Sequence, residues 1–141
     1  MLRLFLGDMK NILQAKELRQ TKFRMSVIDI FDKYSYALTQ EMVEKELVEF
    51  DRITLYRTLK LFVEKGILHE ISIPNQDKKY ALCVEKCESS TNHQHDHVHF
   101  NCTECKQLFC LKIEQYPTIS IAKHRVKKIE IQLEGVCENC L

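Results

Sequence analysis

The residues with the clearest chemical potential lie between His93 and Cys105, in the stretch HQHDHVHFNCTEC. Side chains alternate between the two faces of a β-strand, so the histidines, which occupy every second position, would share one face. Val98 and Phe100 would lie on the other face. Imidazoles in this pattern indicate a metal site, but a solvated polar loop is also consistent with them. The four histidines are His93, His95, His97 and His99.

A Cys-x-x-Cys motif follows these histidines, and a second one lies near the end of the chain. Two such motifs together supply the four thiolates of a tetrahedral structural zinc site, and zinc bound in this way contributes directly to folding. We therefore predict one structural zinc ion, with the ligands Cys102, Cys105, Cys137 and Cys140.

The composition limits the classes of partner and compartment. The 141 residues carry 21 basic and 20 acidic side chains, so any nucleic-acid contact must come from a local patch. Seven cysteines, two pairs of them at ligand spacing, favour metal thiolates in a reducing cytosol over disulfides. The opening MLRLFLGDMK has too short an apolar run for a signal peptide, and no later segment approaches a membrane span. We expect a soluble cytoplasmic protein that does not enter membranes.

Four helices are expected in the first half of the chain. The first ends at about residue 18, and the next three follow the N-caps Thr21, Thr39 and Asp51, with the last one ending at Gly66. The second helix has an apolar face at helical spacing, formed by Phe23, Val27, Ile30, Phe31 and Tyr34.

The last of these helices has the pattern of a DNA-recognition helix. Its core stripe would be Leu55, Leu59 and Phe62, with hydroxyl groups and cations on the outward side. A hairpin of strands 68–73 and 80–82 follows and would form a wing. Candidate DNA contacts are Arg52, Thr54, Tyr56, Arg57, Thr58 and Lys60, with Lys78 and Lys79 near the wing tip. The alternative is a plain helical core with a solvated charged face.

The second half is expected to be a small, mostly β module. Strands are predicted at 98–102, 108–111 and 126–133, and Gly135 would let the chain turn into the second Cys-x-x-Cys motif. About 50 residues are too few for a self-sufficient core, which favours stabilisation by zinc and by a partner subunit in a homodimer. The predicted fold is α+β: a winged-helix domain at 1–84, a polar hinge at 85–92 and a metal-binding dimerisation domain at 93–141.

A second metal site is predicted on the histidine face. If the first Cys-x-x-Cys motif joins its strands symmetrically, His97 lies opposite Cys110 and His99 lies opposite Leu108. These two histidines and Cys110 would form a half-site suited to zinc or another borderline-soft ion. Alternatively, Cys110 is a small buried apolar residue. The residues that could complete the site are Cys83, Cys87, His93 and His95.

The chain resembles the ferric uptake regulator family over nearly its whole length. The resemblance lies in TLYRTLKLFVEKGIL at 54–68, the histidine cluster leading into Cys102-x-x-Cys105, and the terminal Gly135-Val-Cys-x-x-Cys. It implies a winged-helix DNA-binding domain, a dimerisation domain with structural zinc on the two motifs, and a regulatory metal whose binding favours a DNA-competent arrangement.

Individual positions carry the resemblance further. His97 and His99 match the family's regulatory histidines, and Tyr56 and Arg57 match its DNA-contacting positions. Cys110 stands where the iron and peroxide branches carry an acidic ligand.

The sequence also departs from the family pattern. Ala37 and Ala81 stand where a ligand histidine and an acidic ligand are usual, and Pro117 leaves little room for the family's C-terminal helix within 114–128. Cys83 and Cys87 are the nearest substitutes, which favours a thiol-containing zinc site. Iron(II) stays open as the regulatory metal, and peroxide sensing is the alternative function.

The leading hypothesis is therefore a metal-dependent transcriptional repressor of metal-homeostasis genes that binds a palindromic double-stranded DNA operator. A zinc hydrolase or deaminase would need His-Glu-x-x-His, or His-x-Glu paired with Pro-Cys-x-x-Cys; the sequence has neither, so we expect no enzyme. A zinc-stabilised interaction module that never binds DNA is the third hypothesis.

Overall fold

A computed structural model describes residues 6–82, 97–113, 115, 117–127 and 129–141. The chain divides into two compact units, one within Met1–Ser90 and the other within Thr91–Leu141. Mixed helix and sheet confirm the predicted fold class. The predicted hinge at 85–92 lies outside the described residues. Among the described helices, none combines the length and apolar character needed to cross a bilayer.

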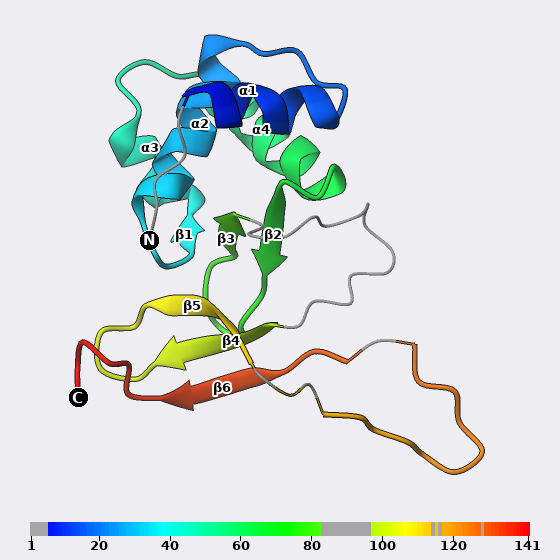
Figure 1. The fold of residues 1–141 in the computed structure, drawn as a ribbon. Helices are drawn as coiled ribbons and strands as arrows, with labels where there is room; N and C mark the ends of the chain where they lie inside the picture. Colours follow the sequence, from blue (N-terminus) through cyan, green and yellow to red (C-terminus); the bar gives the residue numbers. More distant parts are fainter. Residues whose placement is uncertain (1–5, 83–96, 114, 116, 128) are drawn as a thin grey trace. The chain divides into compact units, whose positions relative to one another are not determined.

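The described part of the first unit contains four helices, labelled in Figure 1: α1 (Leu6–Ala15), α2 (Lys22–Lys33), α3 (Gln40–Glu46) and α4 (Arg52–Glu64). All three predicted N-caps are confirmed. The side chains of Thr21, Thr39 and Asp51 each accept the backbone N–H group three residues later. Gly66, just beyond α4, has φ 73°, the left-handed conformation that the predicted helix end requires.

One hydrophobic core holds these helices together. The predicted stripe on α4 is confirmed, because Leu55, Leu59 and Phe62 are fully buried. On α2 the core takes Val27, Ile30 and Phe31 as predicted. Phe23 and Tyr34 are only partly buried, and Ile28 joins the core in addition. The remaining fully buried members come from other elements: Leu13, Leu38, Val43 and Leu68.

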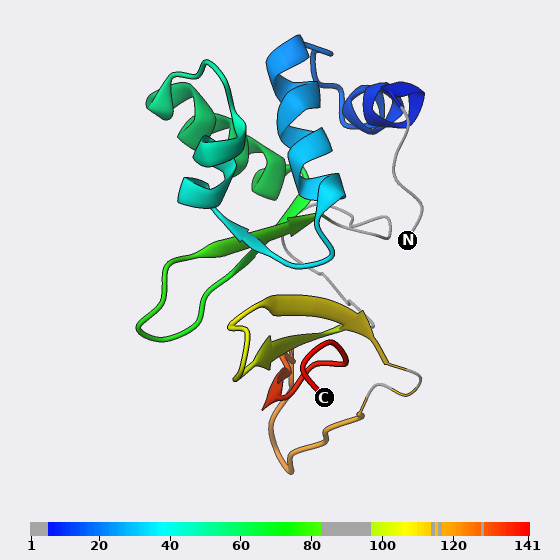
Figure 2. The same cartoon turned by 90° about the vertical axis from the view of Figure 1, so that its left-hand side faces the viewer.

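A small antiparallel sheet completes the first unit. Its strands are β1 (Leu38–Thr39), β2 (Leu68–Ile71) and β3 (Lys79–Leu82), in the order β1-β3-β2. The helices lie together on one side of it (Figure 2). The predicted hairpin is confirmed, but its first strand ends at Ile71 rather than residue 73 because the chain then enters the turn around Asn75, which has φ 62°. The two-residue β1 was not predicted, since so short a segment has no detectable alternation.

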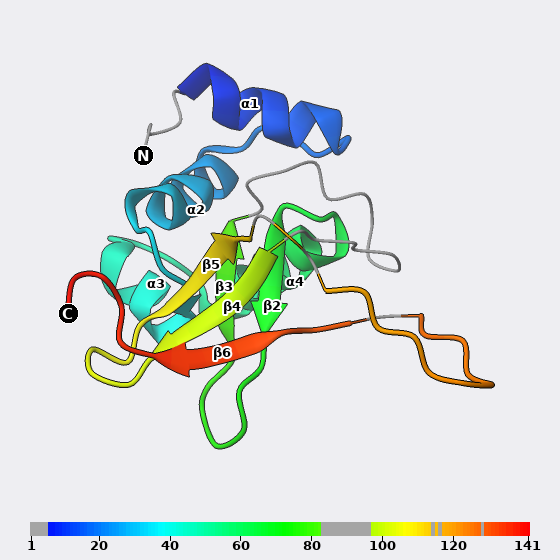
Figure 3. The same ribbon diagram turned by 60° about the horizontal axis from the view of Figure 1, so that its bottom comes forward.

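Among its described residues, the second unit forms a three-stranded sheet of β4 (His97–Cys102), β5 (Leu108–Lys112) and β6 (Gln132–Gly135), in the order β5-β4-β6. Strand β4 pairs antiparallel with β5 and parallel with β6 (Figure 3). The predicted strand at 126–133 is wrong in its start: β6 begins at Gln132, because the ladder to β4 starts only where the Ile131 carbonyl accepts the His99 N–H (3.1 Å). The described residues between β5 and β6 contain no helix.

Candidate metal centre and nucleic-acid surface

The two Cys-x-x-Cys motifs meet in the second unit. One sulfur from each of the four predicted cysteines belongs to a cluster in which all the sulfurs lie within 4.8 Å of one another. Cys102 and Cys137 are buried, whereas Cys105 and Cys140 are at the surface. The sulfurs of Cys105 and Cys137 are 3.9 Å apart. Residues 32 to 38 positions apart in the sequence are thus brought together.

Tight turns and the parallel pairing of β4 with β6 place these sulfurs. The Lys106 N–H donates to the Cys102 carbonyl (3.0 Å), and the Cys140 N–H donates to the Cys137 carbonyl (2.9 Å). Across the strands, the Thr103 N–H and hydroxyl both donate to the Gly135 carbonyl, at 2.8 and 3.1 Å. A Cβ atom at position 135 would lie 3.2 Å from the Phe100 ring, so glycine permits the two motifs to approach.

In the absence of a cation, the electrostatics of the cluster favour deprotonation of one cysteine. A bound cation would favour deprotonation of all four. The backbone N–H of Cys137 donates to the Cys102 sulfur (3.4 Å) and lowers the pKa of that thiol to about 6. The hydrogen bond with Cys137, followed by burial, raises the pKa of Cys140 to about 12. Closely packed sulfurs resist a second negative charge, and a bound cation would remove that resistance.

The geometry suits structural zinc. Four sulfurs at about 2.3 Å from a tetrahedral ion lie about 3.8 Å from one another. The 3.9 Å separation of Cys105 and Cys137 agrees with that edge length, and the other pairs need only small adjustments within the 4.8 Å cluster. Thiolate ligands select zinc over hard cations such as magnesium or calcium.

The structure corrects the predicted register at the second metal site. His99, not His97, lies opposite Cys110, and His97 pairs with Lys112. The turn closes one residue later than a symmetric one would: the Cys102 N–H donates to the Gln107 carbonyl (2.9 Å), and Lys106 has φ 62°. Each residue of β4 therefore meets a partner two positions further along β5.

His99 and Cys110 nevertheless share one face of the sheet, since directly opposed residues project to the same side. The Nε2 atom of His99 is buried, and Cys110 is half-buried. Ala37 and Ala81 are buried in the first unit. The other candidate ligands, Cys83, Cys87, His93 and His95, lie outside the described residues.

Helix α4 presents part of the predicted DNA-contacting set to solvent. Tyr56 is 53% exposed, and Arg57 and Lys60 are also exposed. The predicted outward position of Thr58 is wrong: it is 7% exposed and its hydroxyl donates to the Thr54 carbonyl (2.8 Å). At i+3 from one core leucine, Thr58 falls on the buried face, and its bond to the preceding turn satisfies the hydroxyl there.

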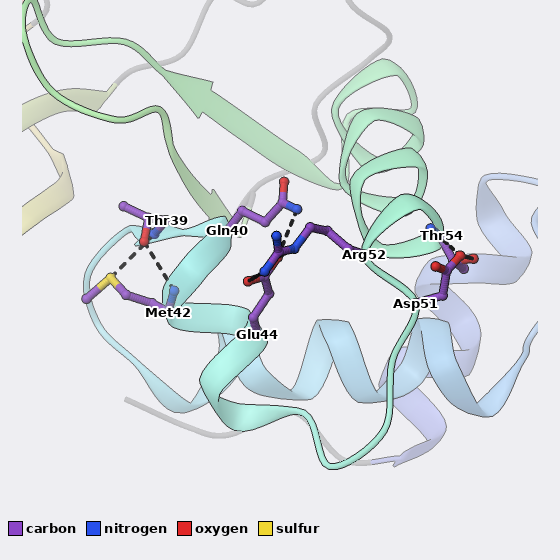
Figure 4. A network of polar contacts seen from close by, with 7 residues as sticks. All are labelled: Thr39, Gln40, Met42, Glu44, Asp51, Arg52 and Thr54. Carbon is purple, nitrogen blue, oxygen red and sulfur yellow. Dashed lines mark hydrogen bonds and ion pairs between the residues drawn. The ribbon is translucent and has the colours of Figure 1, made fainter.

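Two other residues predicted to contact DNA, Thr54 and Arg52, are bonded to carboxylates of the protein (Figure 4). The Thr54 hydroxyl donates to the Asp51 carboxylate (2.7 Å), which lowers the pKa of that carboxyl below its ordinary value. Arg52 forms an ion pair with Glu44 of α3, with 3.2 Å between Nε and Oε1, and Gln40 donates to the same carboxylate (3.2 Å). Arg52 therefore links the two helices of the helix-turn-helix.

The two lysines of the wing, Lys78 and Lys79, have different surroundings. Lys78 forms an ion pair with Glu70 of β2 (2.8 Å), and this hydrogen bond raises the pKa of Lys78. Lys79 is the first residue of β3, half-buried and paired with Ile71 and Thr39. Of these two lysines, only Lys78 lies in the turn between the strands rather than in a strand.

Helix α3 has an unusual N-cap. The side-chain oxygen of Thr39 accepts the Met42 N–H (3.2 Å), and the Met42 sulfur accepts the Thr39 N–H (3.4 Å; Figure 4). This reciprocal pair is a capping box with a thioether where glutamate or glutamine usually stands.

Sequence reasoning missed one exposed residue of the recognition helix. Ile53 is 61% exposed in its first turn. The helical period could have identified it, because Ile53 lies three and four positions before the exposed Tyr56 and Arg57.

Comparisons with known proteins agree with this architecture. Residues 15–136 match the ferric uptake regulator family model. A ferric uptake regulation protein of Staphylococcus epidermidis is 32% identical over 95% of both chains, and one of Staphylococcus aureus is 31% identical over 95% of this chain and 96% of its own. Among solved structures, a zinc uptake regulator complexed with zinc and DNA has a TM-score of 0.66 at 18% identity, covering 96% of this chain and 91% of its own. The Helicobacter pylori ferric uptake regulator, with three functional metal-binding sites, has a TM-score of 0.64 at 14% identity, covering 99% and 97%. The chain belongs to the ferric uptake regulator family.

Proposed function

We propose that this protein is a metal-dependent transcriptional repressor of metal-homeostasis genes, acting as a homodimer on a palindromic DNA operator. The observation that carries the proposal is the combination, in one chain of this family, of an exposed recognition helix and a four-thiol cluster. A two-fold dimer would present two recognition helices to two half-sites.

Structural zinc on Cys102, Cys105, Cys137 and Cys140 is the first part of the proposal. The sulfur cluster has the ligand type and spacing for it. The described part of the second unit buries few large apolar side chains, chiefly Val98, Leu108 and Phe109. A module of this kind depends on its metal for folding.

DNA binding through α4 and the wing is the second part. Tyr56, Arg57 and Lys60 are the exposed candidates on the helix. Arg52 and Lys78 would exchange their carboxylate partners for phosphate groups. Thr54 and Thr58 would support the helix rather than touch DNA, since their hydroxyls bond within the protein.

Regulation by a second divalent ion, zinc or iron(II), is the third part. His97, His99 and Cys110 are the candidates on the sheet, and Cys83, Cys87, His93 and His95 are the candidates to complete the ligand set. An ion bound there would have to favour the DNA-competent state by about 5.5 kcal/mol to move its population from 1:99 to 99:1.

The test is a titration of a labelled duplex, selected from a random library by the zinc-loaded protein. We expect the affinity to fall at least tenfold when a chelator removes the weaker-bound metal while the four-thiol zinc is retained. Unchanged affinity would remove the metal switch from the proposal. Titrating Cys83→Ser, Cys87→Ser and Cys110→Ser with zinc and iron(II) then identifies the ligands.

Variants of α4 separate the repressor from a zinc-stabilised interaction module. Tyr56→Ala and Arg57→Ala should lose operator binding while zinc content and oligomeric state stay unchanged. If both variants bind the duplex as the unmodified protein does, α4 is not the DNA-contacting element.

A further inference from the structure

Most polar side chains in the first turn of α4 are already bonded to other groups of the protein. Asp51 and Thr54 are bonded to each other in the N-cap, and Arg52 is paired with Glu44 of α3, as Figure 4 shows. Leu55 is fully buried. Arg52 is exposed as well as paired, so the exposed side chain of this turn without a polar group is Ile53.

Ile53 belongs to a stripe that runs along the outside of the helix. Positions 53, 56, 57 and 60 follow the i, i+3, i+4, i+7 pattern of one helical face, and all four are exposed. The stripe contains an isoleucine and a tyrosine, 61% and 53% exposed, followed by the cations Arg57 and Lys60. The charged members of this stripe are two cations, so its charge is complementary to DNA; the exposed Glu64 lies one turn beyond Lys60, at the end of the helix.

The N-terminal and C-terminal ends of this stripe would contact different parts of DNA. In a helix-turn-helix, the N-terminal residues of the recognition helix contact base edges in the major groove. An aliphatic side chain there cannot read hydrogen-bonding groups. It can bury the C5-methyl group of thymine, which is the one apolar feature of the groove.

On the basis of the proposed function, we infer that Ile53 is a specificity-determining residue that contacts a thymine methyl group in each operator half-site. A solvent-exposed isoleucine at this position has no role in the core. Its contact would select thymine over cytosine at one position, because unmodified cytosine lacks the methyl group.

The experiment uses the full-length, zinc-loaded protein and the duplex that it selects from a random library. Each thymine is replaced by deoxyuridine in turn, symmetrically in both half-sites, which removes only the methyl group. Losing one buried methyl-sized contact weakens binding about fourfold, or about fifteenfold for two half-sites. We expect one thymine position to show this loss with the unmodified protein and no further loss with Ile53→Ala.

Two variants serve as controls. Ile53→Val keeps a branched aliphatic group and should keep most of the uracil penalty. Ile121→Ala removes an isoleucine of similar exposure, 51%, from the second unit and should keep the whole penalty. If Ile53→Ala shows the same uracil penalties as the unmodified protein, the inference is overturned while the proposed function stands. If no duplex is selected at all, both are overturned.

Discussion

Replacing a single sulfur of the four-thiol cluster tests whether metal holds the second unit together. We consider Cys102→Ser, which removes a fully buried sulfur of the cluster but keeps an oxygen able to accept the Cys137 N–H. The change is therefore nearly isosteric. Its effect should come from loss of the metal ligand rather than from packing.

The expected magnitude follows from the small core of this unit. Burial of Val98, Leu108 and Phe109 stabilises it by roughly 5–9 kcal/mol in total, at about 1.5–3 kcal/mol each. A four-thiolate zinc site contributes about 10–16 kcal/mol, or roughly 3 kcal/mol for each ligand. Losing one ligand should therefore weaken zinc binding about 100-fold and remove a large part of the unit's stability.

The assay combines zinc content after dialysis, competition with a coloured chelator, and thermal unfolding. Cys102→Ser should hold less than one zinc per chain and unfold at a lower temperature. Glu104→Gln is the matched control, because it changes an exposed residue inside the same Cys-x-x-Cys motif and leaves all four sulfurs in place. A Cys102→Ser protein with full zinc content and unchanged unfolding would refute the reasoning.

Three further predictions concern the first unit. Phe62→Ala should lower its free energy of unfolding by about 3–5 kcal/mol in denaturant titrations, because the ring is fully buried. Asp51→Ala should lower the free energy of unfolding at neutral pH through loss of the α4 cap. Since the pKa of Asp51 is lowered in the folded state, this contribution is present above about pH 4 and is lost as the pH falls further, so the two proteins should converge in acid unfolding curves. Glu44→Gln should change stability by less than about 0.5 kcal/mol but strengthen DNA binding, because Arg52 would no longer give up a carboxylate to reach a phosphate; unchanged affinity in DNA titrations would contradict this role.

Local signals predicted much of the fold from the sequence. The caps at Thr21, Thr39 and Asp51 and the core stripe of α4 depend on neighbouring residues, and the structure confirms them. The four cysteines could be grouped because Cys-x-x-Cys spacing imposes the same tight turn wherever it occurs.

Features that depend on tertiary pairing were less predictable. The alternation at 126–133 indicates a strand, yet only the residues from Gln132 onward pair with β4. The partner of His99 depends on where a single turn closes, which Lys106 decides through its positive φ. For the strand and the turn, residue type alone could not distinguish between two neighbouring arrangements. Thr58 is a different case, because its position three residues after Leu55 indicates the buried face and only its polarity suggested solvent.

The methionine in the capping box of α3 places an oxidisable sulfur at the start of this helix. Met42 is 38% exposed and accepts the Thr39 N–H through sulfur, a weak acceptor. Peroxide or hypochlorite would convert it to the sulfoxide, whose oxygen is a stronger acceptor and is not forced into an apolar interior. Oxidative damage at this position would thus tighten the start of the helix instead of fraying it.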